Sequence, residues 1–152
     1  MKFIEEEIID KTIALLNLEN PDTYIQELSN DQPFLIQFIA TENFKLLRDE
    51  EFDTLIFLLS VIWRTVKNEE DPEEVSAQTI EEYDEKNWAV VNEIGNKNFG
   101  KVLDHYFDNY PQEDLLAFVE DTLAGEESNI SQVGKELLLI TCKTFIDSLD
   151  QM

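Results

Sequence analysis

Apolar residues recur at steps of three and four along most of this chain, and no long stretch alternates with a period of two. Such spacing puts apolar side chains on one face of an α-helix, whereas alternation indicates a β-strand. Only four Gly and four Pro interrupt the 152 residues. The pattern predicts an all-α fold of seven or eight helices in a single compact domain over residues 1–152. An irregular bundle and a short stack of helical hairpins both fit these constraints.

Capping residues set the expected helix boundaries. Asp49 is expected to cap one helix, and the stretch from Asp71 to Glu74 has capping-box form, which predicts a helix start with a break near Ser76. Gly95 suits a left-handed C-terminal cap, and Ser128 an N-terminal cap. The expected helices cover about residues 2–16, 21–28, 33–47, 50–67, 71–94, 97–109, 111–125 and 129–149.

Two of these segments are apolar around most of their circumference. Segment 50–67 has a main stripe that includes Trp63 and a second apolar side that includes Phe57. Segment 129–149 is similar, and it contains Cys142, the only cysteine, which is expected to be buried. Helices that are apolar on both sides are usually enclosed by neighbours, so we place these two at the centre of the fold.

A weak internal repeat relates residues 24–53 to residues 79–108. Shifting the chain by 55 positions aligns eight identical residues among thirty, including Phe44 with Phe99 and Phe52 with Phe107. If the repeat is structural, two similar helical units stack on each other, as in short solenoids.

The chain is strongly acidic, with 34 Asp and Glu against 11 Lys and Arg and a formal net charge of -23. A surface of this charge repels phosphate backbones and anionic lipids, so we expect no nucleic-acid partner and no membrane partner. The acidity does not predict disorder, because 43% of the residues are hydrophobic and they are patterned.

Acidic residues are densest between positions 69 and 85, where nine of seventeen residues are acidic and none is Lys or Arg. Charge density without catalytic motifs favours a non-enzymatic protein–protein interaction domain with a basic partner. The predicted partner-binding residues are Glu69, Glu70, Asp71, Glu73, Glu74, Glu81, Glu82, Asp84 and Glu85.

Composition favours a bacterial protein that works in the cytoplasm. Glu5, Glu6 and Glu7 stand where a secretion signal would have its apolar core. The longest near-continuous apolar run, Leu55–Trp63, is far shorter than the roughly 18–20 residues of a membrane span.

Motifs that would indicate metal, cofactor or catalytic chemistry are missing. With one histidine, His105, and one cysteine, the chain fails the ligand count of di-iron and Cys/His zinc sites. It also has no EF-hand loop and no phosphate-binding glycine loop. His105 falls on an outer helix face with Lys97 and Lys101, which indicates a solvated surface. We therefore expect no catalytic residue, metal or cofactor.

Other functions stay open. A small enzyme or ligand sensor would need a pocket between helices, and Asn87, Thr141 and Cys142 are the nearest polar groups within apolar stripes. Acidic helical domains of this size also include nucleic-acid mimics, immunity proteins and antitoxin-like inhibitors. Adaptation to high salt would explain the acidity without any specific partner.

Overall fold

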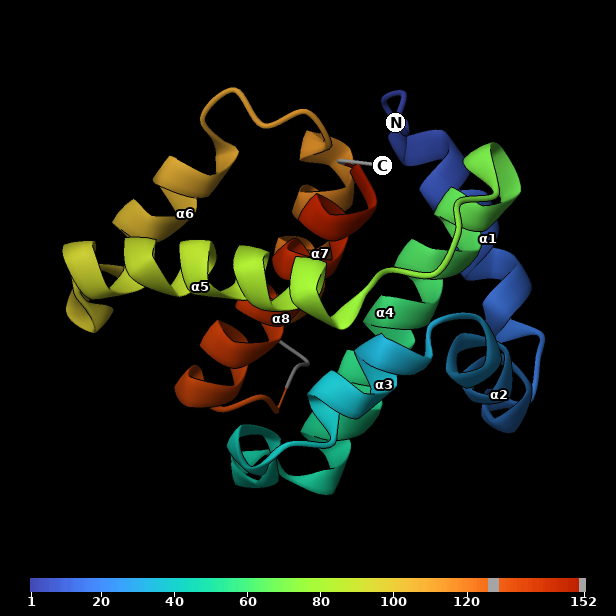
Figure 1. Cartoon of the computed structure of the whole chain (residues 1–152), viewed down its shortest axis with the longest axis horizontal. Helices are drawn as coiled ribbons and strands as arrows, with labels where there is room; N and C mark the ends of the chain where they lie inside the picture. The colour runs from blue at the N-terminus through green and yellow to red at the C-terminus, as the bar shows by residue number, and fades with distance from the viewer. Residues whose placement is uncertain (126–128, 151–152) are drawn as a thin grey trace.

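The structure, a computed structural model, describes residues 1–125 and 129–150, apart from the side chains of Glu42, Asn43 and Asn96 (Figure 1). Those residues form eight α-helices, two short 3-10 helices and no β-strand, which confirms the all-α prediction. The elements are α1 (Glu6–Asn17), α2 (Pro21–Asp31), α3 (Pro33–Ile39), η1 (Glu42–Leu46), α4 (Asp49–Glu70), α5 (Ala77–Ile94), η2 (Asn96–Asn98), α6 (Phe99–Phe107), α7 (Glu113–Ala124) and α8 (Gln132–Asp150).

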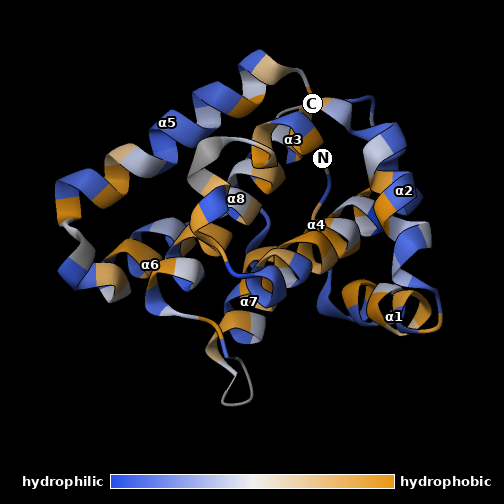
Figure 2. Cartoon of the chain, turned by 90° about the horizontal axis from the view of Figure 1, so that it is seen from below, coloured by the Kyte–Doolittle hydropathy of each residue, from blue (hydrophilic) through white to orange (hydrophobic). Residues whose placement is uncertain are grey.

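Helices α4 and α8 form the centre of the fold, as predicted. α4 packs against α1, α2 and α8, while α8 also packs against α5 and α7. Both helices bury apolar side chains on several sides, and α4 is mostly hydrophobic in Figure 2. Cys142 and Phe145 of α8 are fully buried. Each large apolar side chain enclosed in this way stabilises the fold by about 1.5–3 kcal/mol.

The predicted helix start at Asp71 is wrong, because residues 71–76 form no helix. Asp71 ends α4 in a left-handed conformation with φ 44°, and the extended segment leads back to α5 (Figure 1). The fully buried side chain of Gln32 accepts from the Val75 N–H and donates to the Glu73 carbonyl, so it supplies partners that a helix would otherwise provide. α5 begins after Ser76, whose hydroxyl caps it by accepting from Thr79 N–H at 3.1 Å.

The predicted single helix over residues 33–47 is also wrong. α3 ends at Ile39, and η1 brings the buried Phe44 ring edge-on against Phe38, with 5.5 Å between ring centroids. Residues six apart lie on different faces of a continuous α-helix, so this ring contact requires the break.

Smaller corrections concern caps. The cap of α4 is Arg48 rather than Asp49, and α7 begins at Glu113, two residues after the predicted start at Pro111. Gly95 ends α5 with a positive φ of 95°, but its ψ of 144° is not that of a left-handed helical cap. The predicted cap Ser128 lies outside the described residues.

The two halves of the predicted repeat have different helix layouts. In residues 24–53 the helix is interrupted at Gln32, between α2 and α3. The matching position in residues 79–108 is Asn87, which lies in the middle of α5.

Candidate binding groove between α1, α4 and α7

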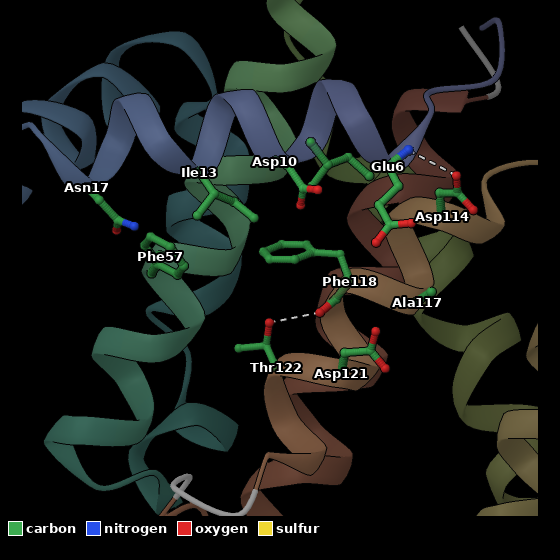
Figure 3. Close-up of a pocket in the computed structure, with 11 residues that line it drawn as sticks. Glu6, Asp10, Ile13, Asn17, Phe57, Asp114, Ala117, Phe118, Asp121 and Thr122 are labelled. Carbon is green, nitrogen blue, oxygen red and sulfur yellow. Dashed lines mark hydrogen bonds between the residues drawn. The ribbon is translucent and has the colours of Figure 1, made fainter.

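A groove of about 560 Å³ opens where α1, α4 and α7 meet (Figure 3). Its lining consists of Glu6, Ile9, Asp10, Ile13, Asn17, Phe57, Asp114, Ala117, Phe118, Asp121 and Thr122. Four other hollows among the described residues have volumes of about 120 to 400 Å³.

Helical spacing explains why these side chains converge. From α1, Glu6, Asp10 and Ile13 follow one another at steps of four and three, which puts them on one face of the helix. From α7, Asp114 and Asp121 lie two turns apart on the side that faces α1. The groove therefore has acidic side chains from two different helices along its edges.

Apolar side chains form the walls and floor beneath these acids. Ile9 is fully buried, while Ile13, Phe57 and Phe118 are half-buried and keep part of their surface toward the groove. Figure 3 shows the Phe118 ring extending from α7 into the hollow below α1, with Phe57 of α4 on the other side of it. An incoming group would therefore meet apolar surface as well as charge.

All charged side chains in the described lining of the groove are negative. Four carboxylates, those of Glu6, Asp10, Asp114 and Asp121, belong to its lining, and none of the described lining residues is Lys or Arg. Asp114 also has a structural role, because its Oδ2 accepts from the Glu6 backbone N–H at 3.0 Å and so caps the start of α1. Burial raises the pKa of the adjacent Glu120, and a hydrogen bond and charge from Asp121 raise it further.

The nine predicted partner-binding acids lie elsewhere. Glu69 and Glu70 end α4, Asp71, Glu73 and Glu74 belong to the extended segment, and Glu81, Glu82, Asp84 and Glu85 lie on α5. Eight of these side chains are exposed, and none of the nine lines the groove. Glu81 borders a smaller hollow of about 170 Å³ beside Phe34 and Phe38.

Asp84 differs from the other eight because it is half-buried. Burial raises its pKa to about 6 from an ordinary 3.8, against a hydrogen bond from Trp88 that lowers it, and the charge of Glu85 adds to the rise. Asp84 is therefore partly protonated near neutral pH, unlike an ordinary surface carboxylate.

A second polar cluster is buried between α5, α6 and α8. Lys143 Nζ donates to Asp147 Oδ2 at 2.8 Å and to Asn87 Oδ1 at 3.0 Å, and it lies 4.8 Å from the ring centroids of both Tyr106 and Tyr110. Burial raises the pKa of both tyrosines, and the charge of Asp147 adds to this effect. Tyr110 in turn donates its hydroxyl to Asp147 at 2.5 Å. The members satisfy one another, so we interpret this cluster as an internal brace of the fold.

The polar groups that sequence analysis associated with a ligand pocket are internal. Asn87 belongs to the Lys143 cluster, and Thr141 donates its hydroxyl to the carbonyl of Leu137. Cys142 is fully buried, as predicted, and burial raises the pKa of its thiol. None of these three side chains lines a hollow found among the described residues.

Sequence analysis did not predict the groove, because its acids come from segments that are far apart in the chain. Glu6 and Asp114 are separated by 108 positions. Two local signals were nevertheless present, namely Glu6 and Asp10 one turn apart and Phe118 between two acids of the same helix face. Both resemble an ordinary solvated helix face until α1 and α7 are brought together.

Further features bear on other functions. His105 is exposed on α6, as expected. Within residues 1–125 and 129–150, no group of three or more His, Cys, Asp and Glu side chains is arranged to hold a metal ion. None of the helices in these residues has the length and apolar character needed to cross a membrane.

Comparison with known proteins returned no relative: the chain matches no protein-family model, no curated protein and no solved structure.

Proposed function

We propose that this chain is a non-enzymatic interaction domain, and that the groove between α1, α4 and α7 binds a basic protein partner. The observation that carries the proposal is the combination of four carboxylates with two phenylalanines in the lining of one hollow, whose described lining residues include no Lys or Arg. Opposite charge on a partner would steer it to the groove, and apolar contact would then hold it there.

The net charge of -23 supports this proposal in a general way, because it speeds encounter with any basic protein. Charge alone does not select a binding site, since exposed acids cover much of the molecule. The groove differs from the rest of that surface because desolvated contacts on its apolar walls contribute more binding energy than exposed ion pairs do.

Chemical-shift mapping tests this function directly. A short peptide of alternating Arg and Leu is added to the isotope-labelled protein, and amide shifts are recorded from about 0.01 M to about 0.15 M salt. We expect the largest shifts in α1 and α7, around Asp10 and Phe118, with weaker binding at the higher salt. Shifts confined to Glu81–Glu85, or no shifts at either salt, would contradict the proposal.

Inhibition of a basic enzyme, as an immunity protein or nucleic-acid mimic would do, is a more specific version of this function. Competition between the peptide and such an enzyme for the groove would favour it. A ligand sensor would instead respond to a small molecule and leave the peptide site unoccupied.

A further inference from the structure

We propose that the groove holds an arginine side chain of the basic partner, with its guanidinium stacked on the ring of Phe118 and facing the carboxylates of α1 and α7. This inference rests on the proposed function and adds the chemical group that is recognised. It concerns a side chain presented by a protein, rather than free arginine.

One internal arginine shows how this fold holds a guanidinium. Arg64 of α4 donates to both carboxylate oxygens of Glu19, at 2.9 and 3.0 Å, and to Glu27 at 2.6 Å. Glu19 precedes α2 and Glu27 lies within it, so carboxylates from two places in the chain enclose one planar cation. The groove offers the same kind of arrangement, with acids from α1 on one side and from α7 on the other.

One internal lysine shows how this fold places a cation against aromatic rings. The Lys143 ammonium is placed over the rings of Tyr106 and Tyr110 while it is paired with Asp147. A cation that contacts an aromatic face and a carboxylate together gains from both. In the groove, Phe118 and Phe57 provide the rings, and Figure 3 shows Asp10 directly above Phe118.

The chain does not supply the groove with an arginine of its own. Its two arginines are Arg48 and Arg64. Arg48 is engaged with Glu51 and with the carbonyl of Asn129, and Arg64 is engaged with Glu19 and Glu27. A guanidinium in the groove must therefore come from another molecule.

Arginine fits this site better than lysine for physical reasons. Its guanidinium is planar, stacks on aromatic faces and can donate to two carboxylates at once. It is also more weakly hydrated than an ammonium, so less is lost when it enters a half-apolar hollow.

The test uses three short peptides that differ at one position, which is Arg, Lys or citrulline, the neutral isostere of arginine. Affinities are measured by calorimetry for the protein of residues 1–152 and two variants. Phe118→Leu keeps apolar volume in the groove but removes the aromatic face. Phe34→Leu is the matched control, because Phe34 is also half-buried but lies in the smaller hollow beside Glu81.

We expect the Arg peptide to bind about 3- to 10-fold more tightly than the Lys peptide, and citrulline to bind weakest. Phe118→Leu should reduce the Arg-to-Lys ratio to about one, while Phe34→Leu should preserve it. If Phe118→Leu does not fold, Asp10→Asn provides the test, since it should weaken the Arg peptide more than the citrulline peptide.

Three results separate failure of this inference from failure of the proposed function. Equal affinity for the Arg and Lys peptides, with both weakened by Glu6→Gln/Asp10→Asn/Asp121→Asn, would overturn the arginine inference and keep the groove as the binding site. Affinity for both peptides that is unaffected by the triple variant would overturn the groove itself. Free arginine that binds as tightly as the Arg peptide would overturn the assignment to a protein partner.

Discussion

The groove and the acidic face of α5 carry charges of the same sign but differ in what lies beside them. In the groove, carboxylates from α1 and α7 border the rings of Phe57 and Phe118. On α5, Glu82 and Glu85 are exposed, and Glu82 accepts a hydrogen bond from Gln78 on the same helix. Glu6, Asp10 and Asp121 are exposed, as the acids of α5 are, but they stand beside apolar side chains that line the same hollow. An ion pair that a partner covers against such a surface is screened less than one left in water. We therefore expect the position of the acids, more than their number, to decide where a partner binds.

The buried carboxylate of Glu51 is expected to stabilise the fold more than any exposed acid does. Glu51 is 2% exposed and accepts from Arg48 N–H at 3.0 Å and from Ser131 N–H at 2.8 Å, so it caps α4 and the approach to α8. Burial works to raise its pKa, but the hydrogen bonds from Arg48 and Ser131 outweigh it and lower the pKa to about 2 from 4.5. Any Cβ at Gly134 would collide with this carboxylate.

We predict that Glu51→Gln lowers the free energy of unfolding by about 3 kcal/mol at neutral pH, the largest effect expected here. Because the pKa in the folded state is depressed, this stability is present above about pH 4.5 and is lost as pH falls toward 2. Urea titrations across that range measure it. A variant as stable as wild type at pH 7 would show that the capping bonds are dispensable.

Two triple variants, one in the groove and one on α5, each remove three negative charges and should differ in their effect on binding. The groove variant carries Glu6→Gln/Asp10→Asn/Asp121→Asn. It should weaken binding of the Arg peptide by about 30-fold, or about 2 kcal/mol, because each of its three substitutions removes a close ion pair with the peptide. Glu81→Gln/Glu82→Gln/Glu85→Gln should weaken it by about threefold at most, through loss of distant attraction alone. A larger loss in the α5 variant would return the site to residues 69–85.

Asp84 is half-buried, unlike the other eight predicted partner-binding acids. Its pKa in the folded state is raised to about 6, so its favourable contribution is fully present below about pH 3.8 and is lost as pH rises through 6. Asp84→Asn should therefore add about 2 kcal/mol at pH 7 and almost nothing near pH 4. The control is Glu82→Gln at an exposed acid of the same helix, which should leave the free energy of unfolding unchanged at both pH values. Equal gains at the two pH values would contradict the effect of burial.

Within the groove, Asp114 and Asp10 should separate stability from binding. Asp114→Ala removes the cap on Glu6 N–H and should lower the free energy of unfolding by about 1 kcal/mol. Asp10→Ala should leave stability within about 0.5 kcal/mol of wild type while it weakens the peptide complex. Thermal unfolding and calorimetry on the same samples test both. Equal stability losses would show that Asp10 is also structural.

The smallest effect concerns total charge. Screening the repulsion among 23 excess negative charges should raise the melting temperature by several degrees between low and moderate NaCl. The groove and α5 triple variants should reduce this salt effect equally, because stability depends on how many charges repel while binding depends on where they lie. A melting temperature independent of salt in wild type would show that the charges are too dispersed to matter.

Much of the fold could be predicted from local pattern. The all-α class, the central positions of α4 and α8 and the burial of Cys142 follow from apolar spacing, which is a property of neighbouring residues. The failed boundaries have tertiary causes. Residues 71–76 are extended because Gln32, about forty positions earlier, binds Val75 and Glu73, and η1 exists because Phe44 packs on Phe38.

Local spacing was enough to predict a helical protein, its two enclosed helices and its strong acidity. Which acids share a hollow with aromatic rings depends on tertiary packing, because Glu6 and Asp114 meet across 108 positions and nothing in their local sequence specifies that contact. The same packing places Lys143, which pairs with Asp147, over two tyrosine rings. Helical spacing acts over a few residues, whereas a binding surface depends on how whole helices pack.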